Sequence, residues 1–177
     1  MSLLVVDNTP LSHFARAGSL SALQGLTAGH RCVAPAEVIK ELMAGVTIHP
    51  AIGAAINLPW LEIVELTEIP EVVAFARYKA ELGGGIKRNS GESAVLAWAH
   101  VHGGTAIIDE RAGTRAARRD NIAVHGTLWL ITNALRANKI TRAVATTMVD
   151  QLAATDMALP TDGAGFMQWA YEEGLLP

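Results

Sequence analysis

The sequence predicts an α/β protein in which a parallel sheet is covered by helices on both faces. Short apolar runs alternate with longer segments of helical periodicity, and the connections between them are short. No internal repeat or low-complexity tract interrupts this alternation. The expected strands, in chain order, cover residues 3–6, 31–34, 61–66, 105–108 and 122–124.

The length and composition suit one domain. The chain has 177 residues, of which 50% are apolar and 18% charged, so it can bury a core and is unlike a disordered chain. We expect a single domain over residues 1–177, with residues 141–177 as a helical portion packed on it. A formal net charge of −3 does not indicate nucleic-acid binding by the whole molecule, although a local basic patch is compatible with it.

The setting indicated by the sequence is a reducing cytoplasm. Cys32 is the only cysteine, so no internal disulfide and no cysteine-based zinc site can form. The N-terminal stretch MSLLVVDNTPL lacks the basic region of a signal peptide. No apolar run approaches the roughly 18 to 20 residues that span a bilayer, so no membrane association is expected.

The first two helices follow the first strand directly. Thr9 can cap a helix and Pro10 suits its first position, which predicts a helix that ends near Gly18. Leucines at helical spacing mark a second, short helix: Leu20, Leu23 and Leu26.

Pro35 opens the next helix, directly after the second expected strand. Its spacing directs Val38, Leu42 and Met43 inward and leaves Glu41 on another side. Further helices are expected at 48–56, 70–82, 91–101, 110–119 and 127–138, and two more follow Thr141, on either side of Pro160. Ser90 is the expected N-cap of the helix at 91–101.

Four carboxylates are expected at one edge of the sheet. Asp7 and Asp109 each follow an apolar run, at the carboxyl end of a strand where open parallel sheets bind ligands. Glu41 lies two turns into a helix that follows a strand, and Glu92 lies in the first turn of another. Because such helices begin or end at this edge, the four side chains can converge.

Converging carboxylates imply a bound cation. They repel one another and raise each other's pKa unless a positive charge neutralises them. Ligands made only of oxygen favour Mg²⁺ or Mn²⁺, and water bound to such an ion can attack a phosphodiester. The sequence therefore predicts a metal-dependent hydrolytic site at Asp7, Glu41, Glu92 and Asp109.

Each carboxylate also has a purely structural interpretation. Asp7 and Asp109 can cap the helices that follow them, and Glu92 can complement a positive helix N-terminus. Glu41 can be a solvated helix residue. The four together, at matching strand ends and helix starts, favour the functional interpretation.

Basic residues suggest where a nucleic acid would lie. Arg111, Arg115 and Arg118 follow i, i+4, i+7 spacing and so share one face of the helix after Asp109. They are either a solvated basic face or a stripe that contacts phosphates beside the metal. Lys87 and Arg88, on the loop that begins with three glycines, are further candidates for the same backbone.

The motifs resemble those of the PIN-domain nucleases, above all their small prokaryotic VapC-like toxin branch or a related PIN-like subgroup. The matching stretches run in the family's order from the N-terminus to about Ile140: VVDNTPLSHFARAG, APAEVIKEL, GESAVLAWA, AIIDERAGTRAA and HGTLWLITNALRANKI. The resemblance implies a three-layer α/β/α fold with a central parallel sheet of about five strands. It also implies that Asp7, Glu41, Glu92 and Asp109 bind Mg²⁺ or Mn²⁺ and cleave RNA as an endoribonuclease.

The same resemblance implies partners. These are an RNA substrate, an antitoxin protein and a second copy of the chain, with Trp129 and Trp169 as candidate apolar contacts in a homodimer. Two alternatives remain open. One is a PIN fold that binds RNA or protein without cutting. The other is a phosphatase of the haloacid dehalogenase type with Asp7 as nucleophile, which Pro10 and the glutamate of APAEVIKEL fit poorly.

Overall fold

The computed structural model describes residues 2–83 and 89–177 and contains the predicted parallel sheet. Its five strands lie in the order β3-β2-β1-β4-β5, with every neighbouring pair parallel. The strands are β1 (Leu3–Val6), β2 (Arg31–Pro35), β3 (Leu61–Val64), β4 (Thr105–Ile107) and β5 (Ala123–His125). All five predicted strands are present, each within two residues of its expected bounds.

Helices connect the strands and continue beyond the sheet. Those of the first half are α1 (Asn8–Arg16), α2 (Leu20–Thr27), α3 (Ala36–Gly45), the short 3₁₀ helix η1 (Pro50–Ala55) and α4 (Ile69–Leu82). Those of the second half are α5 (Ser90–His102), α6 (Arg111–Arg119), α7 (Thr127–Arg136), α8 (Arg142–Ala153) and α9 (Gly163–Glu172). None of these described helices is both long and apolar enough to cross a bilayer.

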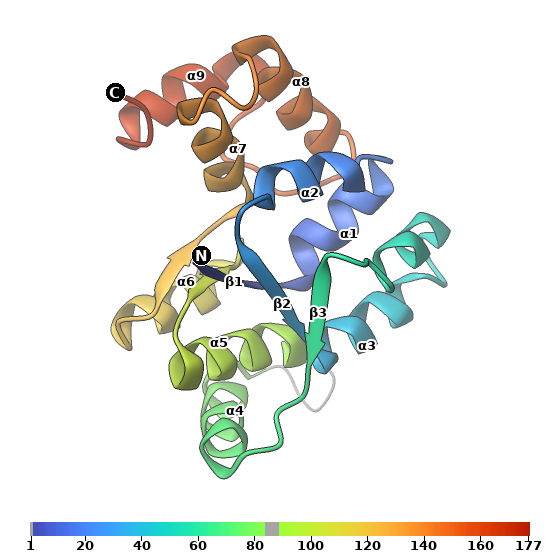
Figure 1. Cartoon of the computed structure of the whole chain (residues 1–177), viewed down its shortest axis with the longest axis vertical. Helices are drawn as coiled ribbons and strands as arrows, with labels where there is room; N and C mark the ends of the chain where they lie inside the picture. Colours follow the sequence, from blue (N-terminus) through green and yellow to red (C-terminus); the bar gives the residue numbers. More distant parts are fainter. Residues whose placement is uncertain (1, 84–88) are drawn as a thin grey trace.

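The helices form layers on the two sides of the sheet, so the predicted three-layer arrangement is confirmed. Helices α4, α5 and α6 pack on one another, and α5 contacts β1, β2 and β4. On the other side α1 contacts α2, α3 and η1 (Figure 1). Helix α7 packs on α2, α8 on α7 and α9 on α8, which extends the fold at one end.

The strand order reverses between β1 and β4. Val6 of β1 lies opposite Ile107 of β4, and the backbone NH of Asp7 donates to the Ile107 carbonyl at 3.2 Å. The connections that leave these two strands run to opposite sides of the sheet, which opens a crevice at their carboxyl ends. Asp7 and Asp109 follow the two strands that flank this crevice.

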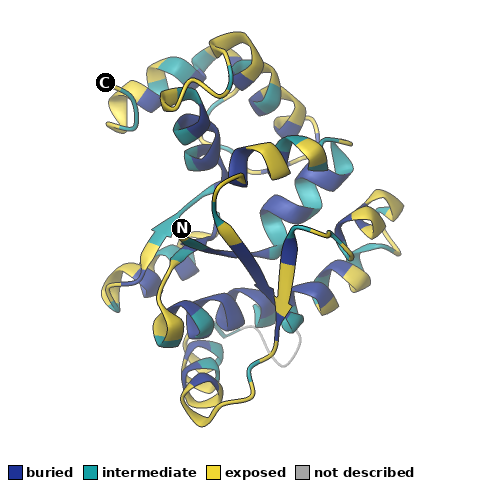
Figure 2. Cartoon of the chain, viewed as in Figure 1, coloured by how far each residue is buried: buried dark blue, intermediate teal, exposed yellow. Residues whose placement is uncertain are grey.

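The core lies between the sheet and the two helical layers. The strands β1 and β2 are buried almost throughout (Figure 2). Phe14 of α1 and Tyr78 of α4 are fully buried. Burial on both faces is what a near-continuous apolar strand predicts. The edge strand β3 exposes Glu62 and Ile63, as an outer strand can.

Several local expectations were wrong. Helix α1 begins at Asn8, so Asp7 is the residue at its N-cap and Pro10 lies inside its first turn rather than at its start. Met43 is 56% exposed, because α3 turns Val38 and Leu42 inward and has no second layer outside them. Asn89, rather than Ser90, precedes α5, with a φ of 57°, a conformation that asparagine tolerates better than serine.

Candidate active site

Asp7 lies at the centre of the candidate site. Its side chain is 4% exposed, and Oδ1 is buried without a hydrogen-bond partner among the described residues, as is Oδ1 of the neighbouring Asn8. The pKa of Asp7 is raised to about 8, mainly by burial; the charges of Glu92 and Glu41 contribute to the rise, and nearby backbone NH groups oppose it. Unpaired buried oxygens are costly, so a missing partner of positive charge is indicated here.

Glu41 connects α3 to the start of α5. Its Oε1 accepts a hydrogen bond from the backbone NH of Gly91 at 2.8 Å. A Cβ at Gly91 would lie 2.7 Å from the other oxygen, Oε2, so only glycine allows this approach. The helix register that places Val38 and Leu42 in the core thus directs Glu41 toward the crevice side of α5.

Glu92 makes the corresponding contact with α6. It is 5% exposed, and its Oε1 accepts from the backbone NH of Gly113 at 3.1 Å. A Cβ at Gly113 would overlap the Glu92 carboxyl group, with Cδ only 2.6 Å away. Burial raises the pKa of Glu92 to about 7, and the charges of Glu110 and Glu41 add to this rise.

Asp109 is held by the start of α7. Its Oδ1 accepts from the backbone NH of Thr127 at 2.8 Å, and its Oδ2 accepts from the Thr127 hydroxyl at 2.7 Å. Gly126 allows the approach, since a Cβ there would lie 2.7 Å from Oδ1. Burial raises the pKa of Asp109, while the bonds from Thr127 lower it.

The structure therefore brings Asp7, Glu41 and Glu92 into electrostatic contact and anchors Asp109 at the same edge of the sheet. Sequence reasoning missed Glu110, an exposed residue whose charge raises the pKa of both Glu92 and Asp109. Its position directly after Asp109, at the carboxyl end of β4, was the signal that could have identified it. Asn8, next to Asp7, was missed in the same way.

Three glycines were also missed. Each lies against one of the carboxylates, and each donates its own NH or precedes the residue that does: Gly91, Gly113 and Gly126. A glycine inside a helical pattern, as at Gly113, indicates that another group packs closely against the helix backbone. This signal could have identified the contact with Glu92 from the sequence. Together they link α3, α5, α6 and α7 around the crevice.

The donor set fits a hard divalent cation. Among residues 2–83 and 89–177, no three His, Cys, Asp or Glu side chains already lie close enough together to hold a metal. Three of the carboxylates accept hydrogen bonds from backbone NH groups, which partly offset the repulsion between the like charges. The unpartnered Asp7 oxygen and an all-carboxylate donor set are what Mg²⁺ or Mn²⁺ requires.

A hollow of about 880 Å³, which we call the carboxylate groove, opens beside Asp109 and Glu110. Helix α1 and the segment 156–160 contribute the remainder of its lining together with two of the predicted arginines, Arg111 and Arg115. Both arginines are exposed, and neither forms an ion pair with any other described residue. Arg118 lines a different, smaller hollow, and Lys87 and Arg88 lie outside the described residues.

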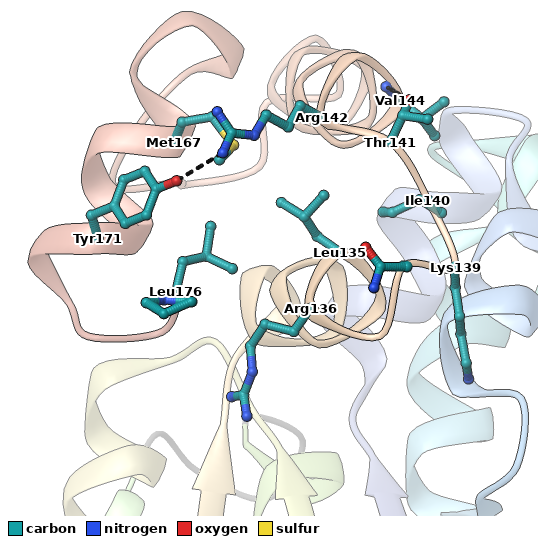
Figure 3. A pocket seen from close by; sticks show the side chains of 12 residues that line it. Leu135, Arg136, Lys139, Ile140, Thr141, Arg142, Val144, Met167, Tyr171 and Leu176 are labelled. Atoms are coloured by element: carbon teal, nitrogen blue, oxygen red, sulfur yellow. Dashed lines mark hydrogen bonds between the residues drawn. The ribbon is translucent and has the colours of Figure 1, made fainter.

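A second large hollow, of about 910 Å³, lies elsewhere, among α7, α8, α9 and the C-terminus (Figure 3). Arg136 and Arg142 line it, and Arg142 donates to the Tyr171 hydroxyl at 3.1 Å. Helix α7 begins at Thr127 beside Asp109, so its last residue, Arg136, is roughly 13 Å further along the helix axis. This hollow is slightly larger than the carboxylate groove, but it contains none of the four carboxylates, so we do not assign the active site to it.

Comparison with known proteins gives the family. A family model described as a PIN domain (DUF3368) matches residues 3–163. No curated protein matches the chain. Among solved structures, this chain is similar to a chain of VapBC2 from Rickettsia felis, crystallised with a DNA fragment from their promoter. The two chains share 16% sequence identity with a TM-score of 0.49, over 70% of this chain and 98% of that chain. That likeness is too low to carry an argument, whereas the family model spans most of the sequence, and the chain therefore belongs to the PIN-domain family.

Proposed function

We propose that this protein is a nuclease that uses Mg²⁺ or Mn²⁺ to hydrolyse phosphodiester bonds in RNA. PIN domains are generally nucleases, and the family match favours this activity over the phosphatase alternative. The observation that carries the proposal is the buried Asp7 Oδ1, which has no partner among the described residues and feels the charges of Glu92 and Glu41. A divalent cation would supply the missing partner and neutralise all three groups.

In this proposal Asp7, Glu41, Glu92 and Asp109 hold the cation. When bound, the cation would lower the pKa of a coordinated water and stabilise the charge that develops on the phosphate. Thr127 fixes the orientation of Asp109 through two hydrogen bonds. The backbone NH of Gly91 donates to Glu41 and that of Gly113 donates to Glu92, and these hydrogen bonds fix the two carboxylates.

The arginines of the carboxylate groove would hold the substrate. Arg111 and Arg115 line the same groove as Asp109 and Glu110. The phosphates of a strand bound there would lie between the two arginine side chains and the metal site. Lys87 and Arg88 remain proposed contacts from outside the described residues.

The biological setting is the second part of the proposal. The resemblance to VapC-like proteins suggests a cytoplasmic toxin with an antitoxin partner, and the chain is proposed to form a homodimer. Trp129 and Trp169 are partly buried and pack against the core of their own chain, so only part of each ring is open to a second copy. Sedimentation at micromolar concentration tests the dimer.

One observation favours a second candidate, a PIN domain that binds nucleic acid without cutting it. The described residues contain no ready group of three metal-binding side chains. In a protein that only binds nucleic acid, Arg111 and Arg115 would still contact phosphates. The carboxylates would then serve only as hydrogen-bond acceptors for backbone NH groups.

The deciding experiment is cleavage of a mixed RNA pool with Mg²⁺, Mn²⁺ or EDTA by the wild type and by Asp7→Asn. A nuclease cuts only with metal and loses cutting in the variant, because the amide cannot replace the unpartnered anionic oxygen. Asp109→Asn is a second test of the same site. Glu172→Gln is the matched control and should cut normally, since this carboxylate on α9 accepts from the Gln168 side chain and from no other side chain in the described part of the protein. A binder would show equal RNA affinity in all variants and no cutting with either metal.

A further inference from the structure

His13 lines the carboxylate groove but has no part in the metal site. It lies on α1 and is half-buried; Thr9, on the same helix, lines the groove as well. Its Nδ1 lies 2.6 Å from the hydroxyl of Thr155, which follows α8. Its other ring nitrogen, Nε2, has no hydrogen-bond partner among the described residues.

The hydrogen bonds of Thr155 determine which nitrogen of His13 carries the proton. The Thr155 hydroxyl lies 2.6 Å from the backbone carbonyl of Leu152, which can only accept a hydrogen bond. The single hydroxyl proton therefore goes to that carbonyl, and His13 Nδ1 must donate to the Thr155 oxygen. In neutral His13 the proton thus lies on Nδ1, and Nε2 is left as an acceptor.

The surroundings keep this imidazole neutral. Burial lowers the pKa of His13, and the nearby charges of Arg16 and His49 lower it further, although Asp156 acts in the opposite direction. Asp156 is itself paired with Arg16 at 3.3 Å, so its charge is partly compensated. His13 thus offers a neutral hydrogen-bond acceptor at a residue that lines the carboxylate groove.

The sugar-phosphate backbone of a nucleic-acid strand offers only one kind of donor to such an acceptor. Phosphate oxygens only accept, and they are expected at Arg111 and Arg115. The donor that accompanies every phosphate along the backbone is the ribose 2′-hydroxyl, which DNA lacks. A carboxylate in the place of His13 would also accept, but its charge would repel the phosphates.

We propose that His13 Nε2 accepts a hydrogen bond from a ribose 2′-hydroxyl of the bound strand and thereby makes the groove select RNA over DNA. This inference rests on the proposed function and adds a reason, built into this chain, for the choice of RNA. The carboxylates that line the groove, Asp109, Glu110 and Asp156, are poorer candidates for this role, because a carboxylate charge would repel the phosphates whereas a neutral imidazole would not.

The test measures binding, so that it does not depend on catalysis. Fluorescein-labelled single strands of one sequence, made as RNA, as 2′-fluoro RNA and as DNA, are titrated with wild-type protein in EDTA and followed by anisotropy. The 2′-fluoro sugar keeps an RNA-like pucker but cannot donate. We expect RNA to bind about five- to tenfold more tightly than 2′-fluoro RNA, the factor that one hydrogen bond supplies.

Variants assign the preference to His13. In His13→Phe the ratio between RNA and 2′-fluoro RNA should fall to about one while 2′-fluoro RNA binds as before. His13→Gln, whose amide oxygen can reach the Nε2 position, should restore part of the ratio. The matched control is His30→Phe, at a half-buried histidine outside the groove, which should leave the ratio unchanged.

The outcomes separate this inference from the proposed function. Equal binding of RNA and 2′-fluoro RNA by the wild type overturns the role of His13, and metal-dependent RNA cutting would then still support the nuclease. If folded His13→Phe kept the wild-type ratio of RNA affinity to 2′-fluoro RNA affinity, the role of His13 would likewise be overturned. Failure of the wild type to bind any strand overturns both. Because the comparison of sugars uses the wild type, it stands even if His13→Phe does not fold.

Discussion

Asp109 accepts two hydrogen bonds from a single residue, Thr127: the backbone NH bonds to Oδ1 at 2.8 Å and the hydroxyl to Oδ2 at 2.7 Å. The contact joins the carboxyl end of β4 to the first residue of α7, where the positive end of the helix favours a negative charge. Each oxygen retains a lone pair, so this anchoring is compatible with metal binding. Asp109 is therefore both a cap and a proposed ligand, although it caps α7 rather than the helix at 110–119 that the sequence suggested.

Thr127→Val should show how much this anchor contributes. The variant keeps the backbone bond and the side-chain shape but removes the hydroxyl bond to Asp109 Oδ2. We expect the free energy of unfolding to fall by about 1–2 kcal/mol, because a buried carboxylate oxygen loses its donor. Thr127→Ser keeps the hydroxyl but loses a buried methyl group, so it should cost less, about 0.8 kcal/mol. Urea unfolding measures both, and an equal loss in the two variants would contradict the role of the hydroxyl bond.

Gly113→Ala should be destabilising although alanine is the better helix former. The new Cβ would overlap the Glu92 carboxyl group, and burial leaves that side chain little room to move. We expect a loss of about 1–3 kcal/mol, as for other overpacked sites, together with weakened RNA cleavage.

Gly25→Ala is the matched control. Gly25 also lies inside a helix, α2, but a Cβ there would meet nothing within 4 Å. The gain in helix propensity should stabilise this variant by up to about 1 kcal/mol. If Gly113→Ala proved as favourable as Gly25→Ala in thermal unfolding, the close packing of Glu92 on α6 would be wrong.

The strands and most helices were predictable because they depend on local signals. Apolar runs mark the buried strands, and Pro70, Gly103 and Pro160 punctuate the helices. The carboxyl ends of β1 and β4 placed Asp7 and Asp109 at one edge, and the strand order confirms that placement.

The contacts of the site were not predictable in this way, because they join residues far apart in the chain. No local pattern pairs Glu41 with Gly91, which lies 50 residues further along. The same holds for the tautomer of His13, which depends on Thr155, at a separation of 142 residues. The start of α1 was also shifted, because Asp7 rather than Thr9 occupies its N-cap position.

Asp7→Asn should stabilise the metal-free protein, increasingly so as the pH rises. The pKa of Asp7 is about 8 in the folded state against an ordinary value of 3.8, so the folded state holds a proton that the unfolded state has lost. The stability of the wild type therefore falls with rising pH between these two values. Asparagine has no such dependence. Melting temperatures in EDTA at pH 5.5, 6.5 and 7.5 should show a widening advantage for the variant; a constant difference would contradict a buried, proton-holding Asp7.

Asp120 should show the opposite dependence on pH. Hydrogen bonds from Arg119 lower its pKa, with further contributions from the Tyr78 hydroxyl and the charge of Arg77. Its contribution is complete above the ordinary value of 3.8 and is lost as the pH falls through the lower folded-state pKa. We expect Asp120→Asn to cost about 1–3 kcal/mol at pH 7 and less near pH 3, measured by urea unfolding. Asp156→Asn, at an exposed pair with Arg16, should change stability by less than about 0.5 kcal/mol at either pH.

Arg115→Gln tests whether the carboxylate groove holds a phosphate backbone. Removing one phosphate contact should weaken the binding of single-stranded RNA of any sequence and reduce the slope of log K against log[salt] by about 0.7. Arg136→Gln is the matched control: it removes the same charge from an exposed arginine of α7, which lines two hollows that contain none of the four carboxylates. Since both variants change the net charge equally, a general electrostatic effect would lower the slope in both. Only a groove that contacts phosphate through Arg115 predicts a lower slope in one and not the other.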